Sequence, residues 1–384
     1  MGRLTAAVLL VAVTVLVGGC WDARDLEDRA TVVGIGLDEA GPGQVEVSAE
    51  IILPRATAAR PGAASGQQGG PEGIQGRMVL QGRGPSVHEA LSRIRDEVKV
   101  DLFLGHVRVV LVGERLARAG VERPLEMLVQ NPQIRRLIPL AVVRGRAADF
   151  LAVPTPQDTT ARYVGDMLDD LVRSGRAPNA DLSRFLTDLS EPGVDPLVSV
   201  LEVSRDTEAG VRWRGLGVFR EDRLARVLPP PRAWLLVWAS GNPRRSSVLV
   251  PLREVVDGGV IINVFHVKSR LWIGGAPGDR RGLLQLLVEA RVAEHGTRGP
   301  DLSKPGVLDG IQRQSRHHLE QELERLVAEV RRLGADPFGI GRALRATEPA
   351  LMPLKAETLR RHAARVPVSV QVSIHIRRTG LTIR

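Results

Sequence analysis

Cysteine and lysine are both scarce in this sequence. Cys20 is the only cysteine among 384 residues, so the chain holds no second thiol with which it could form an internal disulfide. Lysine occurs only four times, so nearly all of the positive charge is arginine. The fold must therefore be held by packing and hydrogen bonds.

Long runs of basic residues are also missing, although the net charge is +9. The 44 acidic residues are mixed among the basic ones along the chain, and aromatic residues make up only 3%. The five tryptophans are scattered and do not interleave with a basic stripe, as a stacking platform for single-stranded nucleic acid would. We predict no nucleic-acid partner, whereas a basic exterior would suit an anionic membrane surface.

The usual catalytic motifs are absent. Gly34-Ile35-Gly36 is followed by a turn where a dinucleotide fold needs a third glycine opening a helix. Ser92 stands where a zinc helix beginning at His88 needs its second imidazole. His317 and His318 are adjacent and diverge on a helix. We predict no catalytic, metal or cofactor-binding residue and no cofactor, and hence no enzyme; a Ser/His/Asp cluster built from distant residues stays open.

The first twenty residues have the layout of a lipoprotein leader. Arg3 is followed by an uncharged stretch, residues 4–17, and then by Gly18, Gly19 and Cys20. A basic start, an apolar run and small residues before a cut are typical of a signal peptide. The ending Val17-Gly18-Gly19-Cys20 resembles a lipobox, in which the cysteine is lipidated and becomes the new N-terminus.

We therefore predict a signal peptide over residues 1–19, cleavage after Gly19 and lipid attachment at Cys20. Two acyl chains would give stable anchoring where a single chain is marginal. An uncleaved membrane anchor is the alternative, because the uncharged run through Trp21 reaches the lower limit for a spanning helix. With either anchor, the remaining chain is expected at a membrane, on its extracytoplasmic face.

The mature chain is long enough for two or more domains, and we predict two α+β domains, residues 20–190 and 191–384. In the first, residues 31–37 and 45–53 favour a β-hairpin. Residues 54–76 are rich in Gly, Ala, Ser and Gln and predict a flexible loop. The remaining predicted elements of this domain alternate between strands and helices. They are strands at 78–81, 103–112 and 136–143, and helices at 85–98, 114–120, 121–130, 154–173 and 181–189.

The second predicted domain is richer in long strands, which makes its sheet antiparallel-rich. Residues 231–240 predict a buried helix, although their two tryptophans leave a membrane-surface role open. Residues 309–333 carry apolar side chains at three- and four-residue spacing and predict a long amphipathic helix that packs on the sheet. The strands are expected at residues 197–203, 212–219, 247–252, 260–273, 283–294 and 367–378.

Several segments, taken in order, resemble the Ger(x)C family of spore germination lipoproteins, the C subunits of nutrient germinant receptors. The resemblance begins at Gly19-Cys20-Trp21-Asp22, and further similar segments follow along the whole mature chain. They include Val33 to Gly36, Gly84 to Ala90, Phe103 to His106, Glu114 to Ala117, Gln133 to Arg135, Leu182 to Asp195, Gly215 to Phe219 and Asp336 to Gly339. The insertion after Pro54 departs from the family pattern.

The resemblance implies an α+β protein of more than one domain, attached to the outer face of the spore inner membrane. Its implied partners are membrane lipid through Cys20 and two integral-membrane receptor subunits of A and B type. His106 and Asp336 match the family pattern, and a folding role is expected for both. Our hypothesis is a non-enzymatic subunit that assembles or couples the receptor. The rival hypothesis is a lipid-anchored protein that binds a small nutrient and delivers it to a transporter.

Overall fold

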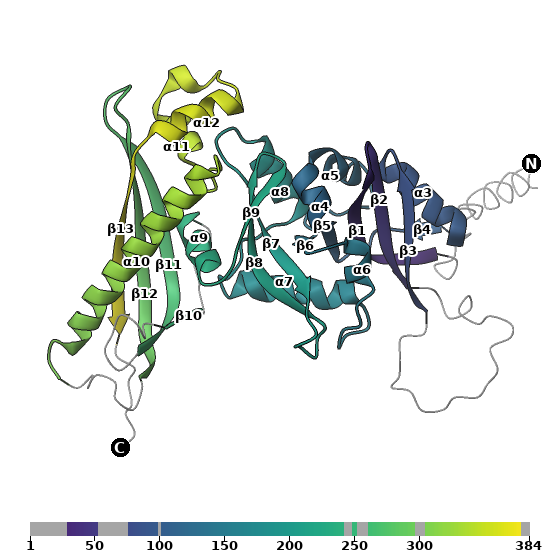
Figure 1. Cartoon of the computed structure of the whole chain (residues 1–384), viewed down its shortest axis with the longest axis horizontal. Helices are drawn as coiled ribbons and strands as arrows, with labels where there is room; N and C mark the ends of the chain where they lie inside the picture. The colour runs from purple at the N-terminus through teal and green to yellow at the C-terminus, as the bar shows by residue number, and fades with distance from the viewer. Residues whose placement is uncertain are drawn as a thin grey trace, which may run out of the picture.

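The computed structural model describes residues 29–52, 76–98, 101–241, 248–251, 260–295 and 304–377. Their strands form two sheets, which occupy opposite ends of an elongated molecule (Figure 1). The first sheet holds the N-terminal part of the chain, and the second lies beside the long helix near the C-terminus. The predicted mixed α and β class is confirmed.

The first sheet has nine strands in the order β3-β2-β1-β5-β6-β7-β8-β9, with β4 pairing with β1. Its central strands β1, β5, β6 and β7 are parallel, and antiparallel strands flank them on both sides. The strands are β1 Arg29–Gly41, β2 Gln44–Ile52, β3 Arg77–Gly84, β4 Asp101–Phe103, β5 Val109–Gly113, β6 Leu140–Val143, β7 Leu197–Val203, β8 Val211–Arg220 and β9 Arg223–Leu228.

Helices cover both faces of this sheet. Side chains alternate between the faces along a strand, so Val110 and Val112 enter one core while Val109 and Leu111 enter the other. The first core includes side chains from α3 Val87–Val98, α4 Glu114–Ala119, α5 Glu122–Val129 and α8 Leu182–Ser190. The second includes side chains from α6 Ala147–Leu151 and α7 Thr160–Arg173.

Two buried carboxylates tie α6 and α7 to the sheet. Asp38 of β1 accepts hydrogen bonds from the backbone N–H groups of Ala147 (2.9 Å) and Ala148 (3.0 Å). Glu50 of β2 accepts from the N–H groups of Thr160 (2.9 Å) and Ala161 (2.8 Å). The first N–H groups of a helix have no partner within it, so these carboxylates satisfy donors that would otherwise be buried unpaired. Burial raises the pKa of both carboxyls although the same hydrogen bonds lower it.

The second sheet has four strands, of which the first three, β10 Val248–Pro251, β11 Val260–Gly274 and β12 Arg281–His295, are antiparallel to one another in sequence order. The last strand, β13 Val368–Arg377, pairs with β12 in the parallel direction. Four helical segments accompany the sheet: α10 Val307–Arg332, α11 Ile340–Thr347, the 3₁₀ turn Pro349–Leu351 and α12 Ala356–Arg365.

The long helix α10 covers one face of the second sheet and also closes its edge at β13. Leu319, Leu323 and Leu326 of α10 are buried in the core against this sheet. On the edge, the backbone N–H of Val372 donates to Glu320 Oε1 (3.0 Å), and that of Ile376 donates to Gln312 Oε1 (2.9 Å). These side chains occupy donors that an exposed edge strand would offer to another chain.

Each sheet with its helices forms one half of the molecule. Helix α9, Arg232–Ala239, lies between the two halves (Figure 1) and contributes to a core on each side. Ala233 and Val237 belong to the core of α6 and α7, whereas Leu236 and Trp238 belong to the core of the second sheet. Trp238 is only 1% exposed. A helix that packs against neighbours on several sides needs apolar side chains on those sides, which explains the apolar run from Ala233 to Ala239. The predicted buried helix is confirmed.

Most of the predicted elements are confirmed, including the first hairpin, the helix at 85–98, the long helix and the strands of the second sheet. The single strand predicted at 103–112 is wrong: β4 ends at Phe103 and β5 begins at Val109. Leu104 and Val107 between them are buried by packing, which made a loop resemble a strand in the apolar pattern. The helix predicted from Pro154 begins only at Thr160.

The predicted division at residue 190 does not coincide with the change of sheet. Strands β7, β8 and β9 follow residue 190 and belong to the first sheet, which continues to Leu228. The division into domains 20–190 and 191–384 stays a prediction. The predicted flexible loop at 54–76 lies outside the described residues except for Gly76, and the signal peptide lies wholly outside them.

Candidate functional site

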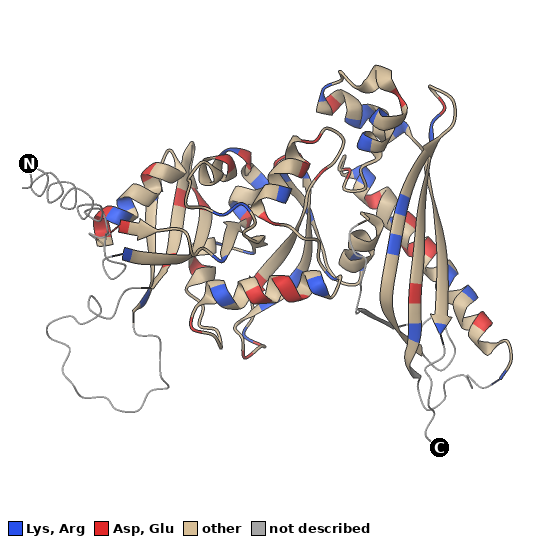
Figure 2. Ribbon diagram, turned by 180° about the vertical axis from the view of Figure 1, so that it is seen from behind, with Lys and Arg blue, Asp and Glu red and all other residues tan. Residues whose placement is uncertain are grey.

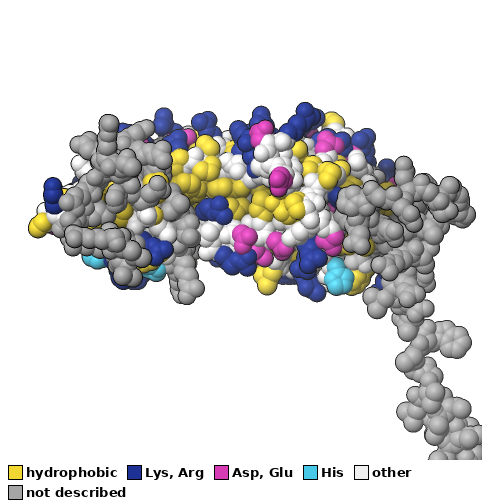
Figure 3. Space-filling view, turned by 90° about the horizontal axis from the view of Figure 1, so that it is seen from below, with side chains coloured by type: hydrophobic (Ala, Val, Ile, Leu, Met, Phe, Trp, Pro, Cys, Tyr) yellow, Lys and Arg dark blue, Asp and Glu magenta, His cyan; other side chains and the backbone are white. Residues whose placement is uncertain are grey.

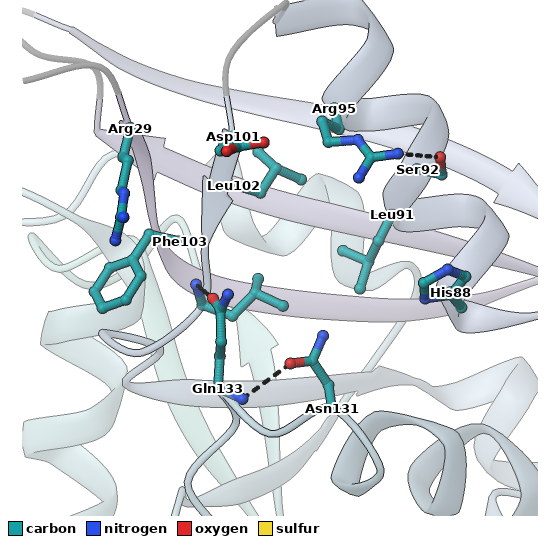
Figure 4. A pocket seen from close by; sticks show the side chains of 11 residues that line it. Arg29, His88, Leu91, Ser92, Arg95, Asp101, Leu102, Phe103, Asn131 and Gln133 are labelled. Carbon is teal, nitrogen blue, oxygen red and sulfur yellow. Dashed lines mark hydrogen bonds between the residues drawn. The ribbon is translucent and has the colours of Figure 1, made fainter. Parts of the chain in front are cut away.

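A pocket of about 330 Å³ lies beside the beginning of β1 in the first sheet (Figure 4). Its polar lining comes from Arg29 at the start of β1, from one face of α3, from Asp101 of β4, and from a loop after α5 that contains Asn131 and Gln133. The residues His88, Ser92 and Arg95 recur along α3 at the spacing that places side chains on one face. The pocket therefore collects cationic and neutral polar groups and one carboxylate from four separate parts of the chain.

Hydrogen bonds hold this lining in place. Arg95 donates to Ser92 Oγ (3.0 Å), and the Gln133 side chain accepts from the Leu104 backbone N–H (2.8 Å). The Arg29 guanidinium lies 5.8 Å from the centre of the Phe103 ring. Guanidinium, imidazole and amide groups, together with the Asp101 carboxylate, suit a small polar ligand that offers both donors and acceptors. No hydrogen bond joins His88 to Ser92 among the described residues.

The second group of polar side chains lies at the junction of the two halves. Asp195, just before β7, accepts hydrogen bonds from the Glu221 N–H (2.8 Å), from Arg360 of α12 (2.8 Å) and from the Asp336 N–H (2.7 Å). Its own N–H donates to the Asp336 carbonyl (3.0 Å). Arg360 also pairs with Glu221. One buried carboxylate thus binds both halves of the molecule.

Asp336 continues this junction into α11. Its carboxylate accepts from the N–H groups of Ile340 (3.0 Å) and Gly341 (2.7 Å). Burial raises the pKa of Asp336 to about 6, the neighbouring Asp195 adds to the rise, and the backbone hydrogen bonds oppose it. Because the pKa is raised, the folded junction favours the protonated carboxyl, and its stability falls as the pH rises through about 6.

Backbone contact between two glycines completes the junction. Gly193 has φ +87°, and a Cβ there would lie 2.5 Å from the Arg342 nitrogen and the Gly341 carbonyl carbon. The Arg342 N–H donates to the Gly193 carbonyl (3.2 Å). Only glycine combines this conformation with so close an approach. A cavity of about 290 Å³ adjoins the junction, between Arg220 of β8 and helix α12.

The predicted site residues are distributed as follows. Cys20 and Gly19 lie outside the described residues, so lipid attachment and cleavage stay predictions. His106 is exposed and packs edge-on against Phe103 with ring centres 5.3 Å apart. Asp336 lies at the junction, consistent with the expected folding role. His317 pairs with Gln321 on α10.

Sequence reasoning missed the groups that meet at this junction. Asp195 lies far from Asp336 and Arg360 in the chain, and no local pattern shows that it accepts hydrogen bonds from both. The described part of the chain contains no group of three or more His, Cys, Asp or Glu side chains placed to hold a metal ion. Within the same residues, no helix is both long and apolar enough to cross a bilayer.

Charged side chains are interspersed over both halves (Figure 2). Acidic and basic residues both occur along α10 in this view. The face seen from below carries apolar side chains across its middle, with Lys and Arg side chains mostly toward its margins (Figure 3). Charge alone therefore marks no single dominant surface.

The fold is similar to that of a solved structure. The crystal structure of the GerBC protein superimposes with a TM-score of 0.53 and 16% identity, covering 89% of this chain and 96% of that one. At this identity the match establishes the fold alone.

Sequence comparison identifies the family. Residues 22–203 match the spore germination protein N-terminal domain, and residues 214–380 match the spore germination B3/GerAC-like C-terminal domain. The chain belongs to the GerAC-like family of spore germination proteins, as its resemblance predicted.

Two relatives in Bacillus subtilis (strain 168) match over nine-tenths or more of their length. The putative spore germination protein YfkR is 25% identical, with 91% of this chain and 90% of that protein covered. Spore germination protein KC is 24% identical, with 98% and 95% covered. The spore germination protein GerQC of Bacillus cereus is 18% identical, with 87% and 88% covered.

Proposed function

We propose that this chain is the lipid-anchored, extracytoplasmic C-type subunit of a spore nutrient germinant receptor. It would assemble or couple the integral-membrane A and B type subunits at the spore inner membrane, without performing bond chemistry. Membership of the GerAC-like family in both halves is the observation that carries this proposal. The lipobox ending at Cys20 supports the anchor.

The junction supports a coupling role. Asp195 joins backbone and side-chain donors from both halves, and α9 contributes to a core on each side. A displacement imposed on one half by a partner would therefore be carried to the other. A packed, hydrogen-bonded junction transmits such a displacement better than a flexible linker would.

The anchor is tested by Cys20→Ala in the full chain. The lipid lies on that thiol in our proposal, so we expect the variant to be released from membranes and germination to fall strongly. Thr14→Ala, in the leader but outside the lipobox, is the matched control and keeps both properties. Membrane fractionation and mass spectrometry of the N-terminal peptide provide the readouts. Full membrane retention and full germination in Cys20→Ala would overturn the anchor.

The coupling role is tested by Arg360→Ala, which leaves Asp195 without its guanidinium partner. We expect normal amounts of membrane-bound protein, a slower germination response and weaker co-purification of the membrane subunits. Arg361→Ala on the same helix is the control, because its side chain donates only to Thr358 on α12. Equal germination in both variants would count against coupling through the junction.

A second candidate function is capture of a small nutrient by this subunit, and the pocket at Arg29 and His88 favours it. Calorimetry on the purified full chain with amino acids and sugars tests this. Micromolar binding that is lost in Arg95→Ala would support capture. Absence of heat with every compound would leave assembly and coupling as the function.

A further inference from the structure

An exposed leucine surrounded by arginines lies at one end of the first sheet. Leu137 is 77% exposed, more than any other large apolar side chain among the described residues. It lies in the loop between α5 and β6, beside a hollow of about 530 Å³ that Arg108, Arg135 and Arg136 also line. A single exposed leucine needs no explanation. An apolar side chain among several cations, however, is typical of surfaces that bind membrane interfaces.

The loop side of this hollow carries an excess of positive charge. Arg108, Arg135 and Arg136 are all exposed, and none of them has a carboxylate within ion-pair distance among the described residues. On the opposite wall, Arg162 of α7 pairs with Asp158 (3.4 Å), and Asp166 and Asp169 add negative charge. The three loop-side guanidinium groups are thus available to an anionic partner.

This surface lies at the end of the sheet where the chain arrives from Cys20. Strands β1, β5 and β6 are parallel, so the segments that lead into them are at the same end. The loop after α5 also contacts the N-terminal pocket through Gln133 and Leu104. Arg29 is the ninth residue after Cys20, and nine residues span at most about 30 Å. A lipid on Cys20 would hold this end close to the bilayer.

We propose that Leu137, Arg108, Arg135 and Arg136 dock on anionic lipid headgroups, with Leu137 entering the membrane interface. The inference rests on the proposed lipid anchor. Arginines attract acidic lipids, and an apolar side chain between them gains contact with the acyl boundary. The short tether favours a lipid surface over an acidic protein, because it brings this surface to the bilayer before any other partner is met.

The scarcity of cysteine makes the test direct. In the lipidated full chain Cys20 carries the acyl group, so Leu137→Cys supplies the only free thiol for an environment-sensitive dye. The labelled protein is reconstituted into phosphatidylcholine vesicles with and without phosphatidylglycerol. We expect a blue shift and several-fold stronger quenching by doxyl lipids when phosphatidylglycerol is present. Met352→Cys, 56% exposed in the other half, is the control and should remain aqueous.

A charge variant tests the arginines separately. Arg135→Ala with Arg136→Ala, in the Leu137→Cys background, should reduce the doxyl quenching several-fold, whereas the exposed Arg123→Ala on α5 should not. Mass spectrometry of the same sample shows whether the lipid is attached. A lipidated protein whose Leu137→Cys dye stays aqueous overturns docking and leaves the anchor intact. A missing lipid overturns both docking and the anchor. If the dye is shielded from water only when other spore membrane proteins are present, docking on lipid is overturned and this surface is assigned to a protein partner.

Discussion

The two halves of the molecule hold their longest helices by different means. In the first, helices cover both faces of a largely parallel sheet, and the buried carboxylate of Glu50 holds the beginning of α7, as Asp38 holds that of α6. In the second, α10 packs on one face of the sheet through apolar side chains, and its Glu320 and Gln312 close the β13 edge. A buried carboxylate holds only a shorter helix there, where Asp336 accepts from the first N–H groups of α11.

The difference determines where each half can meet a partner. Both faces of the first sheet are occupied, so its accessible surfaces are the strand ends, where the pocket and the arginine loop lie. The second sheet leaves its other face partly exposed, with Trp272 at 51% and Leu287 at 43%. Polar anchoring of α7 and apolar packing of α10 lead to different responses to mutation.

The largest effect is expected from Glu50→Ala. The change leaves Arg77, which donates to Glu50 Oε1 (2.6 Å), without its carboxylate, and it leaves the first N–H groups of α7 unpaired. Breaking a buried pair from one side costs about 4 kcal/mol of unfolding free energy. Denaturant unfolding measures this, with Glu39→Ala as the surface control. A loss below about 1 kcal/mol would contradict the anchoring role.

Apolar packing in the second half is tested by Leu323→Ala. Leu323 is 1% exposed in the core beneath α10, and truncating a buried leucine costs about 3 kcal/mol. Leu111→Ala, at 0% exposure in the first sheet, is the matched truncation. Differential scanning calorimetry should show that each variant lowers chiefly the unfolding temperature of its own half. Equal shifts of a single transition would mean that the junction joins both halves into one cooperative unit.

Asp336 predicts a pH dependence at the junction. Burial raises its pKa to about 6 from 3.8, so the folded state holds the proton more tightly than the unfolded state. The stability that this group contributes is present below pH 4 and is lost as the pH rises through 6, by up to about 3 kcal/mol. Asp336→Asn cannot titrate, so its stability deficit relative to the parent should shrink from pH 4 to pH 7. A deficit that stays constant from pH 4 to pH 7 would contradict this pH dependence.

The smallest effect is expected from Glu320→Ala, which uncovers the N–H of Val372 on the β13 edge. Loss of one hydrogen bond costs about 1 kcal/mol. The freed edge should also promote self-association, which sedimentation velocity detects. Glu324→Ala, on the exposed side of α10, serves as the control. An unchanged monomer would show that Gln312 alone protects the edge.

The local sequence pattern predicted much of the secondary structure of this molecule. The apolar repeat of α10, the alternation in β13 and the turn of the first hairpin predicted their elements because each depends on neighbours in the chain. The largely apolar α9 was predicted as buried, although only the structure shows that it contributes to two cores. The family and the predicted leader ending at Cys20 were likewise inferred from the sequence alone.

Tertiary structure decided the rest. Asp195 and Asp336 share hydrogen bonds across 141 residues, and Arg360 reaches Asp195 across 165. Leu137 looked like the start of a buried strand, yet β6 begins only at Leu140 and leaves it in solvent. Periodicity records which face of an element is apolar, whereas the meeting of distant polar groups depends on how elements pack. That is the physical reason why the sequence predicted the elements, while the junction and the arginine loop emerged only from the fold.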